Sequence, residues 1–384
     1  MVAYIISYRE ADMSEPRLHS LDNLKWAVVW LMVAFHASMC YMAYAPEWWY
    51  VVDASQPLFS ATAFVCWTDI FIMPVMFFVS GYFGLMSLAK HGTGEFWKRK
   101  LYHIVAPWIF GAMVIAPFIA YLMLASRNSP TSFREFYTSL FWGPYYQQAH
   151  YWYLGALTAL YAMLTGLCLL SPRFAQRGKV RTPSLLIPAV LFALSAVSIG
   201  IISSAMHPDT WTFYGYVLVL QPVRIPTYIA VFFLGAWAWK TRWFTPEGYA
   251  PACPAWCTLF LLSGLLYLWQ KLFLAPTSSP ALLVWTNALC QSAFTVSALF
   301  ALPAFFHRRF NRASRLSSEL AATSYGVYYL HQPILFPLAW IFTAVPLSSP
   351  LKFLIVSLIT LAASFAMSRF ILNRLSPLRR CFLS

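Results

Sequence analysis

A histidine and a lysine in the first apolar stretch share one face of the helix that this stretch predicts. His36 follows Lys25 by eleven residues. Eleven steps of about 100° come to roughly three full turns, which places the two side chains about 16 Å apart along the axis. An imidazole can take a proton from a hydroxyl, and a cation at the membrane edge can attract an anion, so the pair suggests a path for an anionic reactant. The alternative is a packing histidine that is hydrogen-bonded to a neighbouring helix.

A second histidine is predicted at the same depth. His331 stands about ten residues into the ninth apolar stretch, which starts on the same side of the membrane as the first. Gln332 and Pro333 follow it, and the proline loosens the helix and frees a carbonyl to line a cavity. Two histidines at one level of one bundle indicate a site, although a helix kink with an incidental histidine would give the same pattern.

Four further polar or aromatic residues lie at the predicted outer ends of spans. Asp69 and Arg224 stand near the outer ends of the second and sixth stretches, where a mutual ion pair explains them better than catalysis does. His150 and Trp152 open the fourth stretch on the same side. There His150 could orient an extracytoplasmic ligand or simply cap the helix.

A basic cluster precedes the third span. Lys98, Arg99, Lys100 and His103 lie on about two turns at its cytoplasmic entrance. Their charges and hydrogen-bond donors suit phosphate groups. The cytoplasmic loops of membrane proteins are basic in any case, so the cluster has a topological explanation as well.

The composition is that of a polytopic membrane protein. Hydrophobic residues make up 60% and charged residues 10% of the 384 residues, and the mean hydropathy is +0.62. In hydrocarbon the backbone must satisfy its own polar groups, so we predict an all-α bundle that forms a single domain over residues 1–384. Ten spans are expected near residues 25–44, 64–86, 104–125, 151–170, 184–204, 217–239, 255–275, 282–304, 322–344 and 351–371.

The distribution of Lys and Arg predicts the orientation. They alternate between loops and place both termini, including the polar tail 1–20, in the cytoplasm. The net charge of +14 therefore reflects topology and not a nucleic-acid partner, and the seven cysteines indicate neither a disulfide framework nor a zinc site. The exceptions among the 26 basic residues, at outer positions, are Arg127, Arg134, Arg224, Lys271 and Lys352.

The two longer outward loops, 45–63 and 126–150, are rich in aromatic residues. Trp and Tyr favour the membrane–water interface, and they also stack on sugar rings. The interfacial belt is the commoner arrangement, and both interpretations stay open. The residues concerned are Trp48, Trp49, Tyr50, Trp142, Tyr145, Tyr146, Tyr151 and Trp152.

Four strings of residues, in their order along the chain, resemble the acyltransferase-3 group of integral-membrane O-acyltransferases, and within it the glucans biosynthesis protein C branch. The spacing of Lys25 and His36 resembles the first span of that family. The likeness covers nearly the whole chain. The other three strings are Met76–Phe83 at the end of span two, His150–Leu154 at the entry to span four and Tyr325–Pro333 in span nine.

One position departs from the family pattern. The family usually carries two arginines three residues apart before span three, where this chain has Lys100 and His103. Lysine keeps the charge but lacks the bidentate fork of arginine, and histidine can be neutral. Arg99 could take over by a small rotation of the helix. The difference bears on the affinity for the donor and on its identity.

The resemblance implies an enzyme of the bacterial inner membrane that transfers an acyl group from cytoplasmic acyl-CoA to a hydroxyl of an extracytoplasmic glycan. It implies succinyl-CoA or acetyl-CoA as the co-substrate, a periplasmic glucan as the acceptor, and no resident cofactor or metal. His36 would be the general base, and His331 would orient the acceptor or stabilise the oxyanion. The donor's phosphates would be held by Lys98, Arg99, Lys100 and Lys25.

Two other functions fit part of the pattern. A transporter of an anionic solute or of acyl groups, without group transfer, would also use midplane histidines and cytoplasmic cations. The missing inverted repeat and the four strings favour the enzyme. A non-catalytic scaffold would leave the shared face of Lys25 and His36 unexplained.

Overall fold

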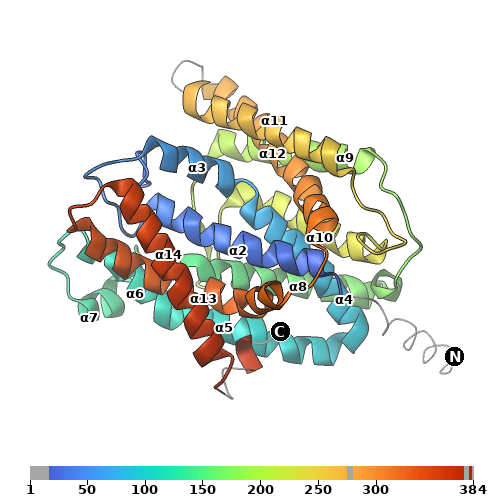
Figure 1. Ribbon diagram of the computed structural model, residues 1–384, viewed down its shortest axis with the longest axis horizontal. Coiled ribbons are helices and arrows are strands. Elements are labelled where there is room, and N and C mark those ends of the chain that lie inside the picture. The colour runs from blue at the N-terminus through green and yellow to red at the C-terminus, as the bar shows by residue number, and fades with distance from the viewer. Residues whose placement is uncertain (1–16, 275–279, 376–379, 383–384) are drawn as a thin grey trace.

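The computed structural model describes residues 17–274, 280–375 and 380–382, so most of the expected polar tail 1–20 lies outside the described residues. The described chain is predominantly helical (Figure 1). The α-helices are α2 (His19–Met39), α3 (Phe59–Asp69), α4 (Ile72–Lys100), α5 (Ala106–Phe110), α6 (Ala116–Ala125), α7 (Phe133–Glu135), α8 (Trp152–Leu170), α9 (Leu186–Ala205), α10 (Ile225–Lys240), α11 (Cys253–Trp269), α12 (Pro280–Arg309), α13 (Arg315–Thr343) and α14 (Ser349–Met367).

Short segments of other structure connect or extend these helices. Within the described residues five are π-helical turns, namely η2 (Leu101–Val105), η3 (Gly111–Ile115), η4 (Phe136–Leu140), η8 (Gln270–Leu274) and η10 (Ser368–Leu372). Three more in the same part of the chain are 3-10 turns, namely η5 (Ala149–Tyr151), η6 (Pro172–Ala175) and η7 (Pro222–Arg224). Strands β1 (Thr212–Tyr214) and β2 (Leu218–Leu220) form an antiparallel hairpin in which Phe213 pairs with Val219.

Six helical segments of the described chain are long and apolar enough to cross a membrane, as judged by length and composition. The molecule is thus an all-α, multi-pass membrane protein. The helices α2, α10 and α13 are not among the six, although the sequence predicts spans there. The six segments are Phe59–Ala125, Ala149–Leu170, Leu186–Ala205, Cys253–Leu274, Pro280–Arg309 and Ser349–Leu372.

Two predicted spans differ from the structure. The span expected at 217–239 begins as strand β2 and turn η7, and helix α10 starts only at Ile225, with Pro226 in its first turn. The span expected at 64–86 is divided, because α3 ends at Asp69 and α4 starts at Ile72. Proline is tolerated in the first turn of a helix but not in its interior, so Pro226 and Pro74 mark where these helices can begin.

Helix α2 runs across the centre of the molecule (Figure 1). In that view α11 and α12 lie above it and α13 and α14 below it, and α2 contacts α3, α4, α12, α13 and α14. The neighbouring pair α4 and α10 is packed closely through two glycines. A Cβ atom on Gly81 would collide with the carbonyl oxygen of Phe232, and one on Gly235 would collide with that of Phe78. Only glycine permits this approach of two backbones.

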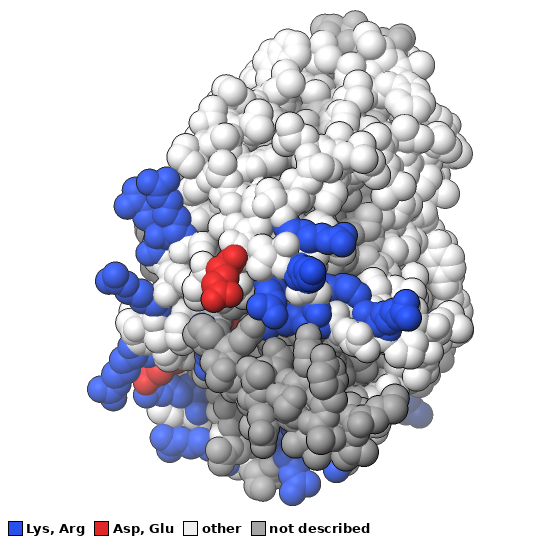
Figure 2. Space-filling view, turned by 90° about the vertical axis from the view of Figure 1, so that its right-hand side faces the viewer, with Lys and Arg blue, Asp and Glu red and all other residues white. Residues whose placement is uncertain are grey.

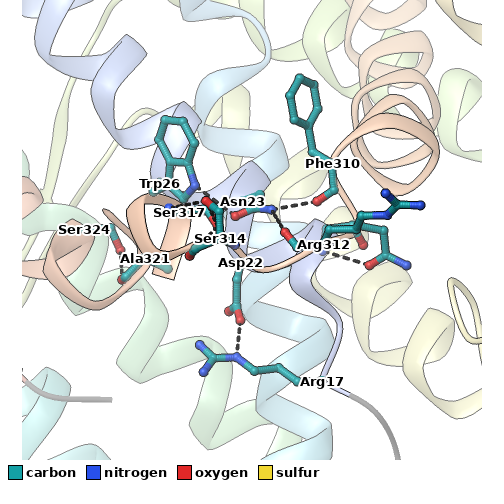
Figure 3. Close-up of polar contacts among 12 residues, drawn as sticks. Arg17, Asp22, Asn23, Trp26, Phe310, Arg312, Ser314, Ser317, Ala321 and Ser324 are labelled. Carbon is teal, nitrogen blue, oxygen red and sulfur yellow. Dashed lines mark hydrogen bonds and ion pairs between the residues drawn. The ribbon is translucent and has the colours of Figure 1, made fainter. Parts of the chain in front are cut away.

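The start of α2 is fastened to the connection between α12 and α13 (Figure 3). Asn23 donates from Nδ2 to the carbonyl oxygen of Phe310 at 2.6 Å, and its Oδ1 accepts from Trp26 Nε1–H at 3.1 Å. Helix α13 then begins with a capping box at Ser314. Because this connection leads directly into α13, these bonds fix the position of α2 relative to α13.

The loop between α2 and α3 (residues 40–58) is held by two cations from other parts of the chain. Lys352 Nζ of α14 lies 2.7 Å from Asp53 Oδ2, and the two side chains are only 3% and 4% exposed. Arg127, just after α6, donates to the carbonyl oxygen of Trp49 at 3.1 Å. Burial alone would raise the pKa of the Asp53 carboxyl, but the hydrogen bonds from Lys352 and Ser55 outweigh it and lower that pKa. Two of the outer basic residues in the charge pattern thus have a structural role.

Replacing one partner of the buried ion pair is expected to destabilise the protein strongly. Lys352→Met leaves the Asp53 carboxylate buried and unpaired, which costs about 3–5 kcal/mol, whereas removal of both charges in Asp53→Asn/Lys352→Met costs much less. Thermal unfolding in detergent measures both variants, with Lys179→Met at an exposed position as the control. Equal loss of stability in the single and double variants would show that the charge pair is not what fixes the loop.

Candidate active site

His36 and His331 form a hydrogen-bonded pair at the meeting of α2 and α13. Nδ1 of His36 lies 2.9 Å from Nε2 of His331, and Nδ1 of His331 lies 2.6 Å from the carbonyl oxygen of Tyr328. A carbonyl only accepts, so Nδ1 of His331 carries the proton and its Nε2 accepts from Nδ1–H of His36. This network assigns the tautomers. It leaves the lone pair of His36 on Nε2, in the form that a base requires.

The ring of His36 is held on two sides. It stacks on His331 with centroids 5.0 Å apart and, at 5.7 Å and an interplanar angle of 14°, on Trp49. His331 is fully buried, and Trp49 is 3% exposed. Trp49 belongs to the loop that Asp53 and Lys352 hold, so that ion pair acts indirectly on the orientation of His36.

His150 brings a third imidazole to this place. The turn η5 buries it, and its ring centroid lies 4.6 Å from that of His331. Its Nε2 lies 3.3 Å from the carbonyl oxygen of Tyr329. The sequence places His150 at the outer end of a span, as a helix cap or ligand contact, and does not predict that it meets the other two histidines. Its side chain points into the bundle because η5 turns the chain before α8 begins.

Two prolines free the carbonyl groups that position these helices. Pro333 cannot donate to the carbonyl of Tyr329 four residues earlier, and that oxygen accepts from Tyr151 Oη–H at 2.9 Å. In the same way Pro107 leaves the carbonyl of His103 without its helical donor, and Tyr325 Oη–H supplies one at 2.6 Å. The segment Tyr325–Pro333 thus contains both a donor and an acceptor of the hydrogen bonds that join α13 to its neighbours.

A cavity of about 780 Å³ reaches this group from one side. His36, His150 and Gln332 lie on its wall, whereas His331 stands behind them. The other walls come from the loop 40–58, from residues 144–153, from residues 208–228 and from α3, η8 and α12. His36 is therefore the member of the paired histidines that a bound reactant can contact.

The ion pair predicted between Asp69 and Arg224 is present. Nη2 of Arg224 contacts Oδ2 of Asp69, and Nη1 donates to the carbonyl oxygen of Asp69 at 3.2 Å. Both residues line the cavity, as does Trp152. Trp152 stacks on Tyr228 with centroids 6.1 Å apart. The pair and the aromatic wall are thus part of the same space as His36.

The predicted phosphate cluster lies elsewhere. Figure 2 shows Lys and Arg side chains gathered on the side of the molecule where α2 starts, with few acidic residues among them. Lys98 and Arg99 both contact Glu95, at 3.9 and 3.1 Å, and Lys100 lies over the rings of Phe96 and Tyr161.

Lys25 belongs to the same region, because it lies close enough to Lys100 and His103 to act on them electrostatically. His103 Nδ1 contacts the carbonyl oxygen of Cys381 at 3.1 Å. None of these basic residues is on the described wall of the cavity. The structure therefore groups the predicted site residues into two sets, at the two ends of α2.

The histidine group is not arranged as a metal site. Within residues 17–274, 280–375 and 380–382, no three His, Cys, Asp or Glu side chains are placed to hold a metal ion together. The imidazole nitrogens between His36 and His331 instead face each other at hydrogen-bonding distance.

Comparison with known proteins identifies the family. No individual curated protein and no solved structure matches the chain significantly. A family model described as an acyltransferase domain matches residues 18–369, which is nearly the whole chain. The match includes the two paired histidines, the cavity wall and the basic cluster. The chain belongs to the acyltransferase-3 family.

Proposed function

We propose that the protein is a membrane O-acyltransferase that moves an acyl group from cytoplasmic acyl-CoA to a hydroxyl of an extracytoplasmic glycan. Its ten spans would place both termini in the cytoplasm of a bacterium and the cavity mouth outside the inner membrane. The observation that carries the proposal is the His36–His331 pair, with its tautomers set by a carbonyl, on the wall of a cavity.

In the proposed reaction His36 is the general base. Its Nε2 takes the proton of the acceptor hydroxyl as that oxygen bonds to the thioester carbonyl carbon. The carbon–sulfur bond of the tetrahedral intermediate then breaks, and the thiolate receives the proton back from His36. The products are the glycan ester and the free thiol of CoA, so no proton is gained or lost.

In this proposal His331 is a positioning residue. It does not line the cavity, so it does not contact the acceptor in the described state. By accepting from Nδ1–H it aims Nε2 of His36 at the substrate and spreads the positive charge of the imidazolium toward the carbonyl of Tyr328. This role replaces the direct contact with acceptor or oxyanion that the sequence suggests for His331.

The donor would enter from the basic end of α2. Lys25, Lys98, Arg99, Lys100 and His103 would bind its phosphates, and the thioester would be carried to His36 on the pantetheine arm, over roughly half the bilayer thickness. Since the cavity stops short of this cluster, the side chains between Lys25 and His36 must move when the donor enters. Met32 lines the inner end of the cavity, and its flexible thioether side chain suits such a movement.

The acyl group and the acceptor are proposed from the family resemblance. The glucan branch implies a succinyl or acetyl group and a periplasmic glucan. The aromatic and amide side chains of the cavity support a sugar acceptor, because rings stack on sugar faces and amides bond to hydroxyls.

His36→Ala is expected to lower the rate of acyl transfer about a hundred- to ten-thousand-fold, since the general base is lost. The protein should keep its thermal unfolding temperature within a few degrees. Incorporation of a radiolabelled acyl group into glycan measures the rate, with His91→Ala as the control. Transfer at an unchanged rate by the His36 variant would refute the assignment.

His331→Ala is expected to lower kcat more than His331→Gln, because glutamine keeps an oxygen that accepts from His36 Nδ1–H. The KM for the acceptor should change little in either variant. Steady-state kinetics separates the two constants. A raised KM with an unchanged kcat would instead assign His331 to acceptor binding.

A transporter is the second candidate, since a large cavity with charged side chains also suits a transported solute. Purified protein that is given acyl-CoA and glycan should release free thiol only if it is a transferase. A thiol reagent measures the release. Uptake of labelled acyl-CoA or acyl anion into vesicles without thiol release would favour transport.

A further inference from the structure

An unbroken series of aromatic contacts leads away from His36 along the wall of the cavity. Trp49 stacks on His36, and Trp48 packs edge-on against Trp49 at 5.7 Å and against Trp211 at 6.3 Å. Trp211 in turn contacts Trp152, with centroids 5.5 Å apart. The five rings that follow His36 are called the aromatic arc, and all of them line the cavity: Trp49, Trp48, Trp211, Trp152 and Tyr228.

The arc ends at a charged pair. Tyr228 lies beside Arg224, which is bound to Asp69. An arginine next to a carboxylate offers donors and acceptors side by side, which matches adjacent hydroxyls of a sugar ring. The cavity thus has a proton acceptor at one end, a hydroxyl-binding pair at the other, and flat apolar rings between them.

The polar groups on the wall favour a neutral ligand with many hydroxyls. Charges of both signs are present, since Asp209 and Lys271 line the cavity in addition to the pair Asp69 and Arg224. These four residues sum to no net charge. Tyrosine hydroxyls and six amide side chains supply further uncharged polar groups on the wall, the amides being Gln147, Gln148, Gln221, Asn287, Gln291 and Gln332.

One of these amide oxygens lacks a partner in the described part of the chain. Oδ1 of Asn287, on α12, is buried without a hydrogen bond. A buried acceptor that lines a cavity is satisfied when a donor enters it. Gln332, on α13, is only 2% exposed and interacts with the side chain of His150, so amide groups from two helices border the same space.

We infer that the aromatic arc is a binding site for a neutral oligosaccharide of three or more sugar residues. The reacting hydroxyl would lie at His36, and the distant end of the glycan at Asp69 and Arg224. This inference rests on the proposed function, because it takes the glycan to be the acceptor. It adds that the enzyme selects its acceptor by chain length, and that a single sugar would fill only part of the arc.

The test measures binding without the donor. Purified full-length protein in detergent is titrated with neutral gluco-oligosaccharides of one to five units, in β-1,2, β-1,3, β-1,4 and α-1,4 series, and heat or tryptophan fluorescence reports the Kd. In at least one series the Kd should fall at least tenfold from one unit to four. Equal affinity for all lengths in every series, or no binding in any of them, would overturn the inference.

Variants locate the binding along the arc. Trp211→Ala should abolish most of the gain with length, whereas Trp211→Phe keeps a flat ring and should retain part of the gain. Trp269→Ala, at an exposed residue that does not line the cavity, is the control. If Trp211→Ala and Trp269→Ala behave alike in properly folded protein, the arc is not the site.

The result is separable from the proposed function. If the unaltered protein transfers acyl groups but binds all chain lengths equally, the arc is rejected as a binding site and the proposed enzyme activity stands. If His36→Ala transfers acyl groups at the normal rate and binding still depends on chain length, His36 is not the general base, but the arc remains a glycan-binding site.

Discussion

A carbonyl oxygen inside a membrane needs a hydrogen-bond donor, and next to the candidate site two prolines make that donor come from another part of the chain. Pro107 and Pro333 each leave the carbonyl four residues earlier without its helical partner. In both cases a tyrosine hydroxyl from another helix or turn lies at the freed oxygen: Tyr325 at His103 and Tyr151 at Tyr329. These two bonds join α13 to the elements around it and so determine where His331 stands. The hydrogen-bonding requirement of the backbone thus fixes the geometry of the imidazole pair.

Helices α2 and α13 are less hydrophobic than the other long helices, and their position in the bundle explains why. The two that carry His36 and His331, α2 and α13, are not among the segments that qualify as spans by length and composition. They contact each other, and α2 also packs against α3, α4, α12 and α14. A helix that is covered by protein needs no continuous apolar surface, because lipid reaches little of it. The two helices of weaker hydropathy are therefore the ones that carry the candidate catalytic histidines.

Much of the candidate site can be predicted from the sequence, because the depth of a residue in the membrane follows from its position along a helix. His36 and His331 lie about ten residues into stretches that start on the same side, and a helix rises by a constant amount per residue. The meeting of His150 with them could not be counted in this way, since it depends on the short turn η5. The pairing of Lys352 with Asp53 could not be predicted either, because the two residues are 299 positions apart in the chain. Local spacing reveals helical register, but contacts between distant segments require the packed molecule. The hairpin at 212–220 was missed because its strands have only three residues each.

Between its two polar ends α2 is packed with apolar side chains. Val28, Val29 and Val33 are at most 3% exposed, and they separate Lys25 from the cavity at His36. A channel open from end to end would let ions and small metabolites leak across the bilayer and dissipate the gradients that the cell maintains. These apolar side chains separate the basic end of α2 from the cavity at its other end. Such a barrier blocks the passage of ions, because an ion is costly to place among apolar groups.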